Sequence, residues 1–270
     1  MVLPVLWQFA FSHFNEKVRW ALDWKGIPHV RRSVLPGIHL AVMPRVTGQA
    51  ETPALLLDGR MVVDSTRIIA ALEQHQPEPA LYPADPHLRA HALALEDYFD
   101  EEIGHPLRKA VLHEAFSEPD WALSLFTMDQ PRWIARVFRL LGDRLLQVYR
   151  ARADVNAASA AHGRERVLAA LDRIEAEIQP SGFLVGDRFS VADLTAAALL
   201  YPLVVPPQFP DRRLPLPVAC VRYRNMLVHR PGFQWVADMY RRYRGPSTAI
   251  EPRRRSSAWL LPLLLRRAPA

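Results

Sequence analysis

A short apolar segment that starts at a proline and runs into a helix-start signal constrains the fold of this chain most strongly. Residues 51–59 read Glu-Thr-Pro-Ala-Leu-Leu-Leu-Asp-Gly, and Val-Val-Asp-Ser follows at 62–65. The pattern predicts strands over 54–57 and 61–63 joined by a turn, then a helix from Asp64 to about His75. The chain must therefore build a hairpin that leads directly into a helix.

The residues before this hairpin predict the rest of a small α/β domain. Residues 3–9 are apolar and indicate a buried strand, and residues 14–25 repeat apolar positions at helical spacing. Residues 28–35 form the next strand candidate, followed by an irregular stretch for which a helix is an alternative. The order β-α-β and then β-β-α predicts a mixed-sheet α/β domain over residues 1–76.

A proline-rich stretch separates this domain from a helical one. Three prolines between Gln76 and Asp85, with a fourth at Pro86, exclude a long helix or a central strand, so we assign residues 77–86 as a linker. Residues 87–245 carry helical periodicity throughout, and Ser190 to Asp193 form a shortened capping box. The apolar stripe of the first helix consists of Leu95, Phe99, Ile103, Leu107 and Val111, with a disturbance expected at Gly104-His105-Pro106. Further helices are predicted over 133–149, 164–178, 194–203, 217–228 and 232–244.

The net charge of +6 belongs to one end of the chain. Residues 241–270 hold eight arginines and a single acid, Glu251, so the remainder is close to neutral. We therefore expect no general affinity for nucleic acid. The tail, residues 246–270, places a tryptophan and leucines between arginine clusters. Contact with an anionic membrane surface is one interpretation, and a terminus that is disordered or folded over the protein's own apolar patch is the favoured one.

Common catalytic signatures are absent from the sequence. The single cysteine, Cys220, excludes an internal disulfide framework and a thiolate metal cluster, and its apolar helical surroundings predict a core thiol. No glycine-rich phosphate loop, CxxC or HExxH occurs, and Glu102 with His105 lacks the second copy that a di-iron site needs. We expect no metal, and a reducing, cytoplasmic location.

Four motifs in a fixed order resemble the cytosolic glutathione transferase superfamily. Residues 12–22 are similar to its first helix, where a catalytic Ser or Cys begins an S/C-P-F/Y-x-x-K/R-V-R pattern. Residues 52–55 are similar to its cis-proline strand, residues 64–69 to its glutathione-anchoring turn, and residues 183–193 to a capped helix of its second domain. The resemblance covers roughly residues 3–240. The chain departs from the pattern at His13, Asn15 and Thr52.

The resemblance implies a thioredoxin-like N-terminal domain with a four-stranded mixed sheet, followed by an all-α domain that supplies a pocket for an electrophile. It implies glutathione as cosubstrate, attack of its thiolate on a small hydrophobic electrophile, and a homodimer. Two alternatives stay open: a non-catalytic binding or scaffold protein with this fold, and a glutathione-dependent isomerase or dehalogenase. The candidates for the pocket lining are Phe99, Leu112, Phe116, Trp121 and Trp133, with a place in the core as the alternative for most of them.

The resemblance assigns glutathione to two backbone features. A cis Thr52–Pro53 bond would turn the backbone of Thr52 outward to pair with an extended peptide; the alternative is a trans proline that starts an edge strand. Asp64 and Ser65 begin a helix, where free N–H groups and the helix dipole attract a carboxylate. Ser65 would bind the γ-glutamyl carboxylate and Asp64 would lie near its amino group, while simple helix capping is the alternative.

The remaining candidates surround the thiol and the glycyl end. Ser12 is the residue expected to stabilise the thiolate, with an N-cap serine as the alternative. His13 would add positive charge or act as a base, or be structural. His39 and Arg45 border the expected position of the glycyl carboxylate, where Arg45 would be a charge partner unless it is only solvated.

Overall fold

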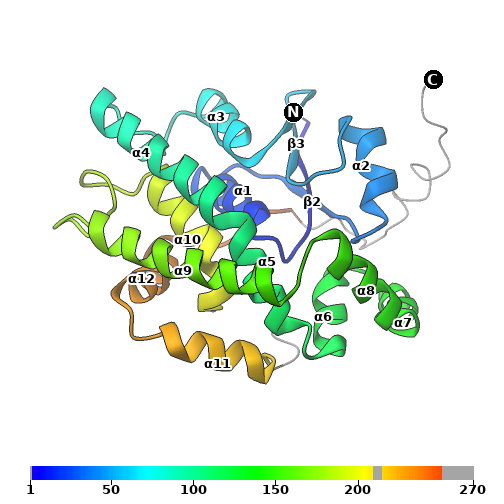
Figure 1. Ribbon diagram of the computed structural model, residues 1–270. Coiled ribbons are helices and arrows are strands. Elements are labelled where there is room, and N and C mark those ends of the chain that lie inside the picture. Colours follow the sequence, from blue (N-terminus) through cyan, green and yellow to red (C-terminus); the bar gives the residue numbers. More distant parts are fainter. Residues whose placement is uncertain (1, 209–214, 251–270) are drawn as a thin grey trace.

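The computed structural model describes residues 2–208 and 215–250. Its N-terminal part alternates strands and helices and then turns entirely helical (Figure 1). The first part contains β1 (Val5–Gln8), α1 (His13–Trp24), β2 (Val30–Ser33), α2 (His39–Thr47), β3 (Ala54–Leu57), β4 (Arg60–Val63) and α3 (Ser65–His75). Every strand and helix predicted for this domain is present, and the irregular stretch before Gly48 contains the helix α2.

The strands of the described residues form one mixed sheet in the order β2-β1-β3-β4. β1 pairs parallel with β2, whereas β3 pairs antiparallel with both β1 and β4. Side chains alternate across the sheet, so Leu6 and its partner Leu55 face α1 and α3, while Trp7 and its partner Ala54 face α2. The predicted mixed-sheet domain is confirmed, with helices covering both faces.

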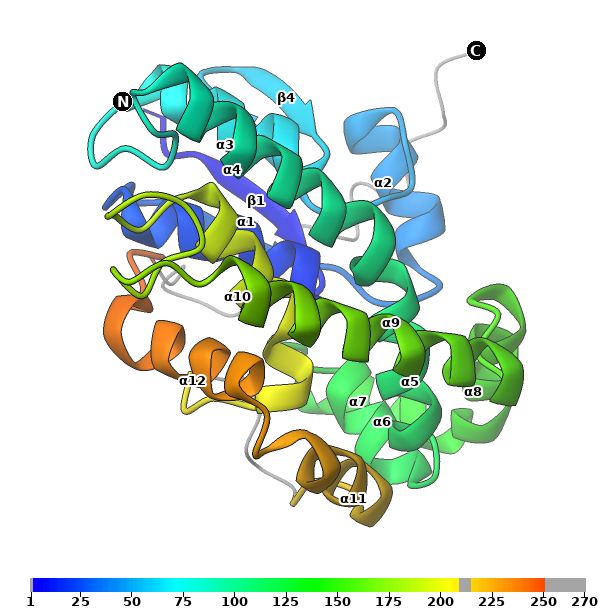
Figure 2. The same ribbon diagram turned by 60° about the vertical axis from the view of Figure 1, so that its left-hand side comes forward.

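The second part is all-helical, as predicted. It contains α4 (Pro86–Tyr98), the π-helix η1 (Phe99–Gly104), α5 (His105–Ala115), α6 (Pro119–Phe126), α7 (Arg132–Leu140), α8 (Gly142–Arg152), α9 (Ala157–Glu177), α10 (Val191–Val204), α11 (Val218–Leu227) and α12 (Pro231–Tyr243). Figures 1 and 2 show α1 and α10 near the centre, with α4, α5 and α9 crossing them on one side. No helix of the described residues is long and apolar enough to span a membrane.

The predicted start of α10 is a buried capping box. Asp193 accepts hydrogen bonds from the backbone N–H of Leu184 at 2.8 Å and from the N–H and hydroxyl of Ser190, each at 2.9 Å. These bonds fix the loop before α10 to its first turn. Because nearly every residue of α10 is buried, this cap positions the central helix of the second domain.

The disturbance predicted around Gly104 is a π-helical turn. Pro106 has no N–H, so the carbonyl of Glu102 loses the donor that an α-helix would provide, and the Arg166 side chain donates to it instead at 3.2 Å. Gly104 lies against the Phe14 ring, where an added Cβ would come within 2.3 Å of the ring. The turn therefore lets α1 approach the helical domain closely.

One predicted helix is wrong in its length. Residues 133–149 form two helices, α7 and α8, which separate at Leu141 and Gly142. Gly142 lies against Leu123 of α6, and a Cβ at this position would approach that side chain to 2.5 Å. The membrane contact considered for the tail falls mostly on residues 251–270, outside the described part of the chain.

Candidate active site

The β1–α1 turn, the start of β3 and the start of α3 bring most of the predicted site residues to one edge of the sheet. The Thr52–Pro53 peptide bond is cis, in agreement with the sequence prediction. The hydroxyl of Thr52 accepts a hydrogen bond from Asn15 Nδ2 at 3.2 Å. Asn15, one of the departures from the family pattern, is fully buried in α1 and thus ties the first helix to the residue before the proline.

The helix cap at the start of α3 is Asp64. Asp64 has a φ of 78° and accepts a hydrogen bond from the Arg67 N–H at 3.0 Å, so it caps the helix. Ser65 follows as the first helical residue and is buried. The N–H groups of the first turn have no partner within an α-helix, and this end carries the positive end of its dipole.

Ser12 is the N-cap residue of α1 by position, but its side chain makes no capping hydrogen bond. Its backbone N–H donates to the Phe9 carbonyl at 3.1 Å, and its own carbonyl accepts from the N–H of Glu16 at 2.9 Å. The backbone of the β1–α1 turn is therefore held in place while the hydroxyl is not used as a cap. Ser12 lines an open cavity.

His13 is buried and neutral at physiological pH. Burial lowers the pKa of its imidazole to about 3, and the positive charge of Arg108 contributes to the same shift. Its Nε2 lies 2.9 Å from the carbonyl oxygen of Gly104, which requires the tautomer that donates from this nitrogen. The ring thus joins α1 to the π-helical turn, and the positive charge considered for His13 is not available.

His39 and Arg45 both lie on α2, away from the cavity lining. His39 Nδ1 accepts a hydrogen bond from the Gly37 N–H at 3.0 Å, and its ring contacts Phe9 edge-on with centroids 4.9 Å apart. Arg45 is exposed and donates to the carbonyl of Ala41. Neither residue is part of the cavity lining that contains Ser12, although the Phe9 ring that His39 contacts is.

The cavity next to Ser12 lies between the two domains and encloses about 760 Å³ of empty space, part of it open to solvent. Its walls come from the β1–α1 turn, from α5, α6 and α8, and from residues at the end of α10 and around the start of α11. Apolar side chains form most of the wall, so the cavity suits a largely apolar ligand.

Only part of the predicted pocket lining is correct. Leu112 and Trp121 line the cavity. Phe99 belongs to the core, Phe116 packs against Phe126 and Tyr149, and Trp133 is 62% exposed on α7. Helical periodicity gives the buried face of each helix but not which buried residues face a cavity.

Three cavity residues differ from, or are missing in, the sequence prediction. Cys220, expected in the core, is half-buried at the cavity wall, where burial raises the pKa of its thiol to about 12 and keeps it protonated. Tyr149 and Arg108 were not identified. Arg108 directly follows Leu107 of the apolar stripe. This cation at the edge of a buried stripe was the only hint in the sequence that Arg108 faces a cavity.

Within the described residues, no group of three His, Cys, Asp or Glu side chains could hold a metal ion.

Known proteins share both halves of this architecture. The family model described as glutathione S-transferase, N-terminal domain matches residues 6–80, and that of the C-terminal domain matches residues 150–225. A probable maleylacetoacetate isomerase from Caenorhabditis elegans is 32% identical over 94 residues, which are 34% of this chain and 44% of that protein. FtsZ-localized protein A from Caulobacter vibrioides is 27% identical over 202 residues, 72% of this chain and 75% of that protein. The chain thus spans less than half the length of the first relative.

Solved structures show the same fold at low identity. The beta-etherase LigF from Sphingobium sp. superimposes with a TM-score of 0.58 at 20% identity, over 88% of this chain and 99% of that one. The theta class glutathione S-transferase from Xanthomonas axonopodis pv. citri, solved with glutathione bound, gives 0.55 at 18% identity, over 87% and 96%. The family models, which match both domains in order, and the mixed sheet followed by helices lead to one assignment. The chain belongs to the glutathione S-transferase superfamily.

Proposed function

We propose that this protein is a glutathione-dependent transferase whose cosubstrate thiolate attacks a small hydrophobic electrophile in the cavity beside Ser12. The observation that carries the proposal is the position of Ser12. Its hydroxyl makes no capping bond, and it lies where the start of α1 meets an apolar cavity between the two domains. A nucleophile held at this point would face the electrophile directly.

Serine and the start of α1 would together stabilise the thiolate. A free thiol has a pKa near 8.5, and lowering it by about two units requires roughly 2.7 kcal/mol of preferential thiolate stabilisation. One hydroxyl hydrogen bond to an anion and the positive end of a helix are each worth on the order of 1 kcal/mol or more. Neutral His13 would serve by holding the start of α1 against Gly104, so serine is the expected thiolate partner.

The peptide part of glutathione is assigned to the sheet edge. The backbone of Thr52, next to the cis Pro53 and held by Asn15, would pair with the cysteinyl residue of glutathione as an added strand. The first-turn N–H groups of α3 and the Ser65 hydroxyl would bind the γ-glutamyl carboxylate, with Asp64 near the amino group. His39 and Arg45 on α2 stay candidates for the glycyl end.

Ser65→Ala is expected to weaken glutathione binding by about 10- to 100-fold, because a hydrogen bond to a carboxylate is worth about 1.5–3 kcal/mol. Calorimetric titration of the intact chain and the variant measures this change. Ser117→Ala, an exposed serine at the end of α5, is the matched control and should bind like wild type. Absence of glutathione binding by the intact chain would refute the transferase and leave a binding protein of this fold.

Ser12→Ala is expected to reduce kcat/KM for an apolar electrophile by about 10- to 100-fold while glutathione affinity stays within about threefold. The thiolate loses its hydrogen bond, but the peptide contacts remain. The pH dependence of the rate should shift upward, since the thiol pKa rises. Unchanged kinetics in Ser12→Ala would remove this serine from the mechanism.

A glutathione-dependent isomerase is the second candidate, because several relatives are named maleylacetoacetate isomerases. Glutathione stoichiometry distinguishes the two: conjugation consumes one glutathione per turnover, and isomerisation returns it. FtsZ-localized protein A, which matches over most of both chains, favours the binding-protein alternative in a similar way. We further infer a cytoplasmic homodimer, for which light scattering would give the mass of two chains.

A further inference from the structure

The cavity beside Ser12 has one charged side chain in an otherwise apolar or neutral wall. Among the described residues that line it there is no aspartate, glutamate or lysine, and His13 is neutral. Arg108, on the first turns of α5, is the charged side chain. A cation placed on an apolar wall is costly unless an anion or a set of acceptors compensates it.

The described part of the chain supplies no anion or set of acceptors that compensates the charge of Arg108. The Nε atom of Arg108 is buried and has no hydrogen-bond partner there, and no ion pair with Arg108 occurs. The exposed pair on the adjacent residue is a contrast, because Lys109 Nζ lies 2.7 Å from Asp154 Oδ2.

The charge of Arg108 is felt by groups around the cavity. It contributes to lowering the pKa of His13 and of His105, after burial as the larger cause in each, and it opposes the burial-driven rise in the pKa of the Tyr149 hydroxyl. His13 and Tyr149 line the cavity from α1 and α8, so the positive field of Arg108 reaches two walls of the space that a ligand would fill, whereas His105 lies outside the lining. Such a field selects an anion.

We propose, on the basis of the transferase function above, that the electrophile carries a carboxylate and that Arg108 binds it. The guanidinium is planar and matches a carboxylate with two parallel N–H···O bonds, which a point charge cannot do. The apolar wall would hold the hydrocarbon part of the same molecule. Arg108 thus determines which electrophiles react, while Ser12 acts on the thiol.

A matched pair of electrophiles tests this assignment: 4-(chloromethyl)benzoate and its methyl ester. In both, the glutathione thiolate forms a C–S bond to the benzylic carbon while chloride leaves with the bonding electrons of the C–Cl bond. Arg108→Met is expected to lower kcat/KM for the carboxylate about 10- to 100-fold and for the ester less than about threefold. Arg108→Lys should recover part of the difference. Lys109→Met, which removes the neighbouring charge, should change neither.

Two further measurements keep the test decisive. Because Arg108 has no partner in the described residues, Arg108→Met should melt at or above the wild-type temperature. Wild type should also bind 4-butylbenzoate in preference to 4-butylbenzamide without glutathione, and Arg108→Met should lose that preference. An equal loss of activity on both electrophiles, or equal binding of the two probes by wild type, would overturn the proposal.

The probe titration separates this inference from the proposed function. If neither electrophile reacts and glutathione does not bind, the transferase function fails, and the titration alone decides whether the anion site exists. If glutathione binds and the ester reacts but the carboxylate preference is absent, the function stands and the role of Arg108 is wrong.

Discussion

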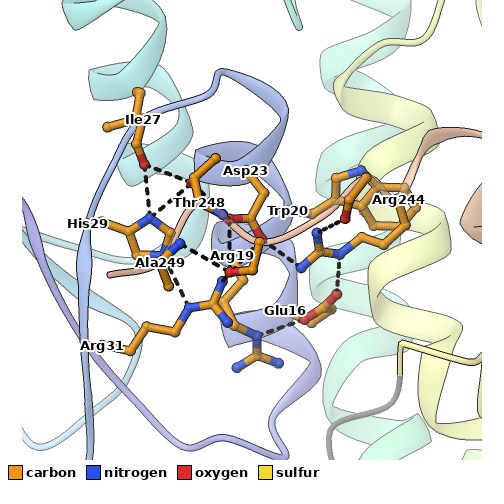
Figure 3. A network of polar contacts seen from close by, with 12 residues as sticks. Glu16, Arg19, Trp20, Asp23, Ile27, His29, Arg31, Arg244, Thr248 and Ala249 are labelled. Carbon is orange, nitrogen blue, oxygen red and sulfur yellow. Dashed lines mark hydrogen bonds and ion pairs between the residues drawn. The ribbon is translucent and has the colours of Figure 1, made fainter. Parts of the chain in front are cut away.

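Replacement of Arg244 by methionine is expected to lower the free energy of unfolding by about 3 kcal/mol, because it leaves two buried carboxylates without their shared cation. Arg244 lies just after α12 and reaches α1, where Nε is 2.7 Å from Glu16 Oε1 and Nη2 is 2.9 Å from Asp23 Oδ2 (Figure 3). The value lies at the lower end for a buried pair, since Arg19 still contacts Glu16 and Arg31 still contacts Asp23.

The control lies three residues away. Arg241 pairs with Asp238 on the surface of α12 and is 78% exposed, so Arg241→Met should change the free energy of unfolding by no more than about 0.5 kcal/mol. Urea denaturation of the two variants gives the comparison. Equal effects would show that the Arg244 cluster contributes no more than a surface pair.

The pH dependence of the stability lost in Arg244→Met follows from the pKa of Glu16. Burial alone would raise the pKa of its carboxyl, but the charges of Arg244 and Arg19 and their hydrogen bonds lower it to about 2. A folded pKa below the unfolded value of 4.5 gives stability that is complete above pH 4.5 and is lost as the pH falls toward 2. The difference between wild type and Arg244→Met should therefore shrink across this window.

The same cluster fixes the chain beyond α12 to the first domain, through polar contacts rather than over the apolar patch that the sequence suggested. Thr248 donates from its N–H to Asp23 Oδ1 at 2.8 Å, and the N–H of Ile250 donates to the His29 carbonyl at 2.8 Å. Ala249 forms an isolated parallel bridge with His29 just before the edge strand β2, as Figure 3 shows beside the Asp23 contacts. Residues 246–250, assigned to the tail from composition, are thus docked by polar contacts.

The first domain was predictable because its local signals agree with its tertiary contacts. β3 and β4 have the predicted hairpin, and Asp64 caps α3 where the sequence placed a helix start. In the helical domain the period of a helix was readable, and Pro106 marked the disturbance before α5, but the break between α7 and α8 was not predicted. The close contact of Gly142 with Leu123 of α6 is tertiary, and helical periodicity carries no signal for it.

The candidate site also has a part that local sequence predicts and a part that it does not. Short motifs with local backbone geometry contain Thr52, Pro53, Asp64 and Ser12, so the places of these residues at one sheet edge could be predicted. The cavity wall is assembled from five separate segments, and its charge depends on which residue of α5 turns inward. Periodicity allowed Trp133 as readily as Trp121, and it gave no reason to select Arg108. The residues proposed to select the electrophile could therefore be identified only from the structure.

The largest loss of stability is expected for Lys17→Met, which removes the cation from a buried cluster between the two domains. Lys17 Nζ of α1 lies 2.8 Å from Glu96 Oε1 of α4 and 2.5 Å from Asp100 Oδ2 of η1. Lys17 and Glu96 are both fully buried. Burial opposes the charged form of Lys17, but the two carboxylates outweigh it and raise the pKa of the amine, so Lys17 is charged at neutral pH.

Without the amine, Glu96 must either stay charged in the interior or take up a proton, and its pKa is already raised, chiefly by burial. We expect Lys17→Met to lose about 3–5 kcal/mol at pH 7, and less at pH 5, where a raised pKa leaves Glu96 more readily protonated. Lys109→Met, which removes the exposed pair with Asp154, is the control and should have a far smaller effect.

The double variant Lys17→Met/Glu96→Gln decides whether the loss comes from the unpaired charge. Because a neutral amide needs no counterion, it should recover at least half of the stability that Lys17→Met loses in urea denaturation. No recovery would mean that packing of the lysine stem, rather than its charge, joins the domains. Since Lys17 lies on the same helix as Ser12, glutathione affinity equal to wild type in the double variant would show that this cluster stabilises the fold without forming part of the site.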